Sequence, residues 1–213
     1  PMHLSVMDGG LDMVEYIYYM SLNYGGMEVF LADTTGKVNL LSGSQPQLDG
    51  LKLSENGKKA AYLDTDANTG DTILVEIELG KEKAETVATN VQSFGYIGNT
   101  LIYYFDYTEG VGTLGAAGSK TTIANASGVQ FTEDAVYYVA DADAATGNGE
   151  LRAWDGKTET AIAKDVFAFQ YKENGKLVYI GKYDVNAGVG DLYYYDGKEA
   201  RKLDTGITAI FIY

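Results

Sequence analysis

Short apolar runs alternate with turns rich in Gly, Asp and Asn along the whole chain. The C-terminal stretch shows this pattern most fully, with the runs LVYIGKYD, DLYYYD and ITAIFIY separated by Gly- and Asp-containing turns. Aromatic and β-branched residues in runs of this length are typical of β-strands. No stretch of ten or more residues has an apolar period of 3.6, so we predict an all-β chain with essentially no helix.

The pattern repeats, and each repeat divides into four strands that we name a, b, c and d. The c strands begin near Met27, Asp71, Gly112, Glu150 and Asp191, at separations of 44, 41, 38 and 41 residues. Four strands in a period of ~40–45 residues are typical of β-propeller blades. The sequence therefore predicts a single β-propeller domain over residues 1–213, with about five four-stranded blades at roughly 12–54, 55–97, 98–132, 133–171 and 172–213. A β-sandwich of unrelated hairpins is the alternative.

The segment ITAIFIY at 207–213 is predicted to close the ring of blades. Both of its alternating faces are largely apolar, which suits a strand that is covered on both sides. Placed innermost in the first blade, it would pair beside the strand at 14–21. The alternative is that HLSVM at 3–7 is that innermost strand. In that case ITAIFIY begins a sixth blade and the chain is a fragment.

Composition excludes several classes of function. The net charge of −14 argues against binding to nucleic acid or to anionic membrane surfaces, because both need Lys and Arg. The absence of Cys removes disulfides, thiol catalysis and thiolate metal sites. No apolar run approaches the roughly 20 residues of a membrane span, so we expect no membrane insertion. The start of the chain lacks the features of a signal peptide, and we expect it to be processed or cut from a larger chain.

Two units carry a resemblance to a known family. They are ENGKKAAYLDTDANTGDTILVEIELGKEKAETVA and ENGKLVYIGKYDVNAGVGDLYYYDGKEARKLDTG, each with a short turn, an apolar strand, an Asp/Gly loop, a third strand and a basic turn. In this order of features the chain resembles the TolB-like β-propellers of bacterial periplasmic and cell-surface proteins, over about residues 12–213. The resemblance implies an extracytoplasmic interaction module within a larger protein. It concerns how blades are built and does not by itself assign a function.

Acidic b–c loops are candidates for calcium. Asp64, Asp66, Asn68 and Asp71 place oxygen atoms at alternating positions, as calcium loops do. The Gly of this loop, however, falls one position later than the EF-hand pattern requires. We favour the interpretation that these side chains cap a tight hairpin turn. The sequence therefore predicts no cofactor, with calcium as the alternative.

Few other residues are candidates for catalysis, metal binding or partner binding. His3 is the one histidine, which argues against a Ser-His-Asp triad or a histidine-based zinc site. The recurring Tyr of the b strands follows the repeat and is predicted to be structural. Tyr24 and Tyr107 fall in b–c loops and are candidates for ligand or partner binding, since exposed Tyr suits binding surfaces. Trp154 is a third candidate, although packing within its blade is the favoured interpretation.

The sequence thus favours a non-catalytic module of a bacterial secreted or cell-surface protein that binds another protein or a glycan. The alternative is a carbohydrate-active enzyme with a pair of carboxylates in the central channel. Such an enzyme needs two carboxylates held at a defined separation. The observation that distinguishes them is whether carboxylates converge at one mouth of the channel beside an aromatic side chain.

Overall fold

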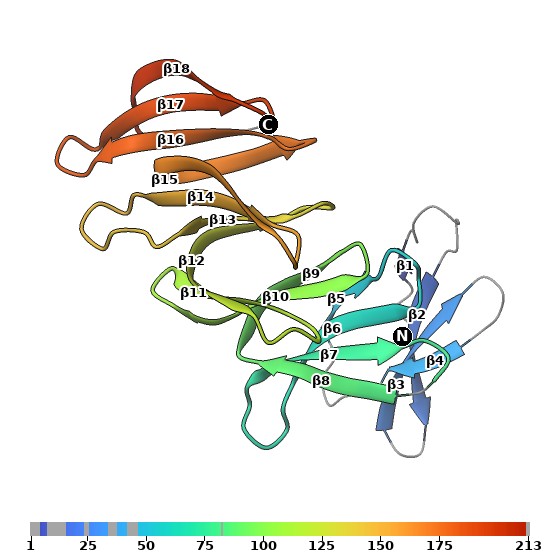
Figure 1. Cartoon of the computed structure of the whole chain (residues 1–213). Helices are drawn as coiled ribbons and strands as arrows, with labels where there is room; N and C mark the ends of the chain where they lie inside the picture. The colour runs from blue at the N-terminus through green and yellow to red at the C-terminus, as the bar shows by residue number, and fades with distance from the viewer. Residues whose placement is uncertain are drawn as a thin grey trace. The chain divides into compact units, whose positions relative to one another are not determined.

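The computed structural model describes residues 5–7, 16–23, 26–33, 38–41, 47–81 and 83–211. Side chains are described for 30–32, 50–81 and 84–211. These described residues form antiparallel β-strands joined by turns, and they include no helix (Figure 1). The predicted all-β class is confirmed.

The strands form three sheets, and in each sheet neighbours in sequence are neighbours in space. The first sheet has the order β1 (Ser5–Met7), β2 (Tyr16–Asn23), β3 (Gly26–Asp33) and β4 (Val38–Leu41). The second has β5 (Gln47–Leu53), β6 (Lys59–Thr65), β7 (Thr72–Glu78) and β8 (Lys83–Thr89). The third runs through β9 (Val91–Ile97), β10 (Thr100–Thr108), β11 (Val111–Ala116), β12 (Thr122–Phe131), β13 (Val136–Ala140), β14 (Gly149–Trp154), β15 (Glu159–Glu173), β16 (Lys176–Asp184), β17 (Val189–Tyr195) and β18 (Ala200–Ile207).

Two long strands of the third sheet each serve two predicted repeats. β12 pairs with β11 through residues 122–127 and with β13 through residues 126–131. β15 pairs with β14 through 159–166 and with β16 through 166–173. Each strand is therefore strand d of one repeat and strand a of the next. Its register shifts where the pairing partner changes, and such bulges bend a strand and increase its twist.

The chain divides into two compact units. The first comprises Pro1–Asp106 with Ala116–Gly118, and the second comprises Tyr107–Gly115 with Ser119–Tyr213. Each unit has its own hydrophobic core. The predicted single domain over 1–213 remains a prediction.

In the first unit, the sheet of β5–β8 is covered on both faces. Successive side chains of a strand point to opposite faces, and β6 follows this rule. Ala60 and Tyr62 join one core cluster with Leu31, whereas Ala61 joins another with Phe94. A strand that is apolar on both faces is therefore needed at this position, and the sequence KAAYLDT supplies it.

In the second unit, the core is built around the recurring Tyr of the b strands. Tyr137 and Tyr179 are buried in one cluster together with Leu151, Val166 and Phe169. The sequence predicted a structural role for this Tyr because its spacing follows the repeat. Its burial here and that of its counterpart Tyr62 in the first unit agree with that prediction, whereas Tyr103 is half-buried and packs against the Phe94 cluster.

The predicted closure by the C-terminal segment was wrong. β2 pairs with β1 on one side and with β3 on the other, so Ser5–Met7 from HLSVM occupies the place that was expected for ITAIFIY. β18 ends at Ile207, and residues 208–211 form no strand. An apolar sequence on both faces suits a covered strand, but it does not determine which neighbour covers it.

Candidate functional site

The three aromatic residues predicted to bind a ligand or partner have different surroundings. Tyr107 is 48% exposed near the end of β10, so its ring is accessible. Trp154, at the end of β14, is 2% exposed. Its ring is therefore part of the core, in the position that the packing interpretation requires. Tyr24 lies outside the described residues.

The four calcium candidates lie in and around the turn between β6 and β7. The carboxylate of Asp66 accepts hydrogen bonds from the backbone N–H groups of Asn68 (2.8 Å) and Thr69 (3.2 Å). These bonds, with that from Asn68 first, hold the pKa of Asp66 below its usual value. Asp64 is 2% exposed and accepts a bond from the N–H of Thr65, whereas Asp71 is exposed. The turn thus closes through bonds within the chain.

The same turn recurs in the second unit. Asp143 and Asp184 each accept hydrogen bonds from the N–H groups two and three residues further on, and each is followed by a Gly at the fourth position. That Gly has positive φ in both loops, 72° at Gly147 and 69° at Gly188. The D-x-x-x-G sequence is therefore the local determinant of these turns, because Asp caps the turn and Gly tolerates its left-handed end.

Consecutive a–b turns of the first unit bond directly to each other. The N–H of Glu55, in the β5–β6 turn, donates to the carbonyl of Gly98 in the β9–β10 turn (3.0 Å). The N–H of Asn56 donates to the side-chain oxygen of Asn99 (3.0 Å). These two bonds hold the two turns against each other, and we call the β5–β6 and β9–β10 turns the sealed pair.

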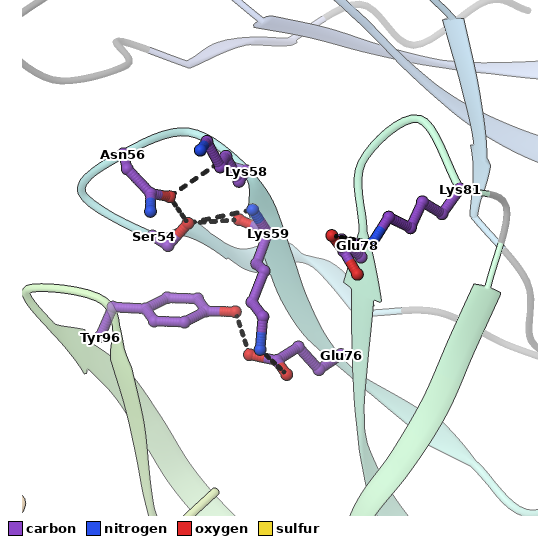
Figure 2. Close-up of polar contacts among 8 residues, drawn as sticks. All are labelled: Ser54, Asn56, Lys58, Lys59, Glu76, Glu78, Lys81 and Tyr96. Atoms are coloured by element: carbon purple, nitrogen blue, oxygen red, sulfur yellow. Dashed lines mark hydrogen bonds and ion pairs between the residues drawn. The ribbon is translucent and has the colours of Figure 1, made fainter. Parts of the chain in front are cut away.

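A charged network lies beside this sealed pair of turns. Figure 2 shows Lys59 and Tyr96 reaching Glu76 from different strands. The ammonium of Lys59 is 2.8 Å from one carboxylate oxygen, and the Tyr96 hydroxyl donates to the other at 2.8 Å. Burial first, and then the bond to Glu76, raise the pKa of Tyr96. The charged or polar group of each of these three side chains has a partner. The network is therefore suited to joining the sheet of β7 to the sheet of β9.

The corresponding pair of turns in the second unit encloses a cavity. Its walls are residues 131–134 at the β12–β13 turn and residues 171–174 at the β15–β16 turn, and its volume is about 350 Å³. Three carboxylates line it, those of Glu133, Asp134 and Glu173, together with the ammonium of Lys172. Within the described residues, no hydrogen bond or ion pair engages these four side chains. The cavity therefore has free charged groups at its rim.

The two walls are fixed to each other below the cavity. Gln130 in β12 donates from its amide nitrogen to the carbonyl of Phe169 (3.0 Å) and accepts from the N–H of Tyr171 (3.0 Å). One side chain thus satisfies two backbone groups of β15, as a neighbouring strand would. The position of Tyr171 at the cavity wall is consequently set by a two-point attachment.

Aromatic rings form the apolar part of the cavity. Phe131 and Tyr171 are half-buried in its lining. The Tyr171 ring packs at a tilt against Tyr137, with the ring centres 4.9 Å apart, and its hydroxyl accepts from the N–H of Gly175 (3.3 Å). One face of the Tyr171 ring is therefore occupied, and its contribution to a ligand comes from the remaining surface.

Sequence reasoning assigns turns at 133–134 and 173–175 and strands at 128–132 and 166–171, and it did not predict a site there. The β12–β13 turn and the β15–β16 turn are about 40 residues apart in the chain, one repeat period. A signal was present, since two acidic turns occur at the same place in consecutive repeats. Whether such turns bond or leave a space depends on their three-dimensional packing.

The described residues contain neither a cluster of metal ligands nor a membrane-spanning helix. No group of three or more His, Asp or Glu side chains among them is placed to hold a metal ion. Nor do they contain a helix with the length and apolarity to cross a membrane.

Comparison with known proteins shows a fold and no family. No model of a protein family matches the sequence, and no curated protein matches it. The structure is similar to an acylaminoacyl peptidase solved with Z-Gly-Gly-Phe-chloromethyl ketone, with a TM-score of 0.53, 12% identity, and 93% of this chain matched to 39% of that one. It is also similar to the β-propeller domain of the Trilobed protease from Pyrococcus furiosus, described as having an open velcro topology (TM-score 0.53, 14% identity, 95% of this chain and 71% of that one).

At such identities the likeness shows the fold alone, and it confirms a propeller-like fold. The chain spans 39% of the length of the acylaminoacyl peptidase. TolB from Acinetobacter baumannii is matched with a TM-score of 0.41 and 14% identity, over 90% of this chain and 52% of that one. That score is too low to support an argument, so kinship with TolB in particular remains a prediction.

Proposed function

We propose that the chain is a non-catalytic interaction module built from about five consecutive propeller blades, which binds another protein or a glycan. The double use of β12 and β15 supports five groups of four strands, because each of these strands ends one repeat and begins the next. The pairing of β1 with β2 supports a propeller that is open, as in the domain of the Trilobed protease.

The cavity between residues 131–134 and 171–174 is the observation that carries this proposal. Binding sites are concave, with an apolar lining and a small number of polar groups that fix the ligand. This cavity has Phe131 and Tyr171 as its apolar part and four charged side chains without partners. Its counterpart in the first unit is sealed by bonds between turns, so these two pairs of turns differ in whether they leave a cavity.

The proposed setting is a larger bacterial extracytoplasmic protein. The resemblance of the repeats to TolB-like propellers supports this location. The matched structures support the role as a module, because the chain corresponds to 39% of one of them and 71% of the other. No nucleic acid partner is proposed, because the net charge of −14 repels phosphate backbones.

The test is binding without turnover. The full chain is titrated with mixtures of peptides and of oligosaccharides while its backbone amide NMR signals are followed, and the mixtures are then analysed for products. We expect saturable shifts at the amides of residues 132–134 and 172–174, with every added compound recovered unchanged. If saturable shifts occurred only at the amide signals of other residues, the cavity would not be the binding site.

A carbohydrate-active enzyme is the second candidate, because the same cavity gathers Glu133, Asp134 and Glu173 beside an aromatic ring. Glycosidases use a carboxylate pair whose separation is fixed, at about 5 to about 9.5 Å according to mechanism. Release of reducing sugar from the oligosaccharide mixture, lost in Glu133→Gln or Glu173→Gln, would favour this candidate over the non-catalytic one. We expect no release.

A further inference from the structure

We propose that the cavity receives the cationic side chain of an arginine or lysine from a partner protein. This inference rests on the proposed function, since it takes the cavity as the binding site, and it names the chemistry of the ligand. A cation is the group that the lining of the cavity lacks.

Charge at the rim is the first argument. Three carboxylates face one ammonium in the lining, and no hydrogen bond or ion pair within the described residues neutralises them. A cation near carboxylates that outnumber the ammonium has a net favourable charge interaction with the lining. The walls are already fixed by the Gln130 bonds, so little ordering has to accompany binding.

The two aromatic residues within the largely polar lining are the second argument. Arginine and lysine carry an apolar stem behind the charge, and they pack it against aromatic or aliphatic surface. Phe131 and Tyr171 provide that surface beside the carboxylates. A guanidinium or ammonium near an aromatic ring is also attracted by the ring's electrons.

Shape distinguishes a side chain from a sugar. One face of Tyr171 packs against Tyr137 with ring centres 4.9 Å apart, which reduces the aromatic surface on which a sugar ring could stack. The volume of about 350 Å³ is at the lower end of the range for ligand pockets, roughly 300–1,000 Å³, which favours a small group over an oligosaccharide. The net charge of −14 would in addition attract a basic partner over a distance.

The experiment uses the full chain and two blocked tripeptides, acetyl-Gly-Arg-Gly-amide and the same peptide with citrulline, which has the shape of arginine without the charge. Binding is followed by the amide NMR signals of residues 132–134 and 172–174. We expect the arginine peptide to cause saturable shifts at these signals and the citrulline peptide to cause none.

Charge variants then identify the source of affinity. The isosteric pair Glu133→Gln with Asp134→Asn should weaken arginine binding about tenfold or more, because each partly exposed ion pair is worth about fivefold at low salt. Lys172→Gln should strengthen binding about two- to threefold, since it removes the opposing charge. The control pair Asp71→Asn with Glu109→Gln removes the same two charges from exposed positions outside the cavity lining, and should change the affinity less than about twofold.

Four outcomes would overturn the inference. Equal weakening by the control pair would show general electrostatic attraction and no site. Equal binding by spermidine would show that the ligand is a free organic cation and not a protein side chain. Binding of the citrulline peptide or of a neutral oligosaccharide at the same amides, as tightly as the arginine peptide, would leave the proposed binding function intact and refute the cationic ligand. No shift at these amides with any probe would refute both.

Discussion

Two pairs of consecutive a–b turns show how the same repeat gives different surfaces. In the first unit, the β5–β6 and β9–β10 turns bond to each other through Glu55, Gly98, Asn56 and Asn99. In the second unit, the β12–β13 and β15–β16 turns stand on either side of a cavity of about 350 Å³. The first two turns belong to different sheets, that of β5–β8 and that of β9–β18, whereas the second two turns belong to the same sheet. The arrangement of the sheets therefore differs between the two pairs, in addition to the residues of the turns.

The charged side chains near the two pairs of turns also differ in whether they have partners. Beside the sealed pair, Lys59, Glu76 and Tyr96 satisfy one another. Around the cavity, the charged side chains have no partners within the described residues, and the contact between repeats is made lower down by Gln130. A contact that satisfies its own polar groups stabilises the fold, whereas one that leaves them free is available to a ligand.

The largest expected effect is at the joint below the cavity. Gln130→Ala leaves the carbonyl of Phe169 and the N–H of Tyr171 without their partner, and each unsatisfied group costs about 1–3 kcal/mol. We expect the free energy of unfolding in urea to fall by about 2–4 kcal/mol. The control is Gln92→Ala in β9, at an exposed position, which should leave it nearly unchanged. A small loss for Gln130→Ala would show that the walls are held by other contacts.

The next effect is at the sealed pair. Glu76 has 13% of its side chain exposed, and Glu76→Ala removes the partner of both Lys59 and the Tyr96 hydroxyl. We expect a loss of about 2–3 kcal/mol, because a half-buried hydroxyl and an ammonium lose their acceptor together. Glu78→Ala is the control: its ion pair with Lys81 is exposed on both sides, and the urea midpoint should not move measurably. Equal effects of the two variants would contradict the joining role of Glu76.

Glycine substitutions compare the backbones of the two pairs of turns. Gly98 and Gly175 have φ of 59° and 73°, a region that costs an L-residue with a side chain about 1–2 kcal/mol. We expect Gly98→Ala and Gly175→Ala to lose about 1–2 kcal/mol each, because the atoms nearest to the added carbon are a flexible carboxylate oxygen at 3.3 Å and a hydroxyl at 3.8 Å.

The matching Asn variants should lose less, since Asn tolerates this conformation better than Ala does. If the variants at Gly98 and Gly175 lose similar stability, the two pairs of turns differ in their side chains and not in their backbones. A much greater loss at Gly98 would instead place the difference in the backbone.

The smallest effect is a pH dependence at Tyr96. The pKa of this hydroxyl is raised in the folded protein by burial and by its bond to Glu76, relative to about 10 in the unfolded chain. The unfolded chain therefore loses its proton first as the pH rises, and stability that is fully present below about pH 10 declines above it.

Tyr96→Phe should reduce this decline by at most about 1.4 kcal/mol per pH unit. The measurement is urea unfolding at a series of pH values, and between about pH 6 and about 8 the two proteins should change in parallel. An unchanged decline above about pH 10 would show that Tyr96 does not contribute to it.

Much of the fold could be predicted because its signals are local. The D-x-x-x-G turns, the alternating apolar strands and the recurring buried Tyr each depend on residues within one hairpin. The ends of the fold could not be predicted in the same way. Ser5–Met7 and the 207–213 segment are both apolar and compete for one edge of β2, and the sequence pattern of each fits that edge.

The candidate site was predicted less well than the fold. Tyr107 is accessible, and its role in binding stays a prediction, whereas Trp154 lies in the core, as its favoured packing interpretation expected. Residues 133–134 and 173–174 were recognised as turn residues, and 131–132 and 171 as strand residues, with no site predicted there. Exposure and the convergence of side chains are properties of packing, which a local pattern does not contain.

The sequence by itself determined the strands, their turns and their period, because hydrogen bonding within a hairpin involves residues close together in the chain. The tertiary structure decided which strand pairs with β2, and which pair of turns is sealed and which remains open. Those outcomes depend on contacts between residues about 40 positions apart, where the geometry of whole sheets sets the distance between two turns. Glu55 and Glu133 occupy similar turns in the sequence, and their surroundings differ because Gly98 bonds to the backbone of one, while the other faces an open space.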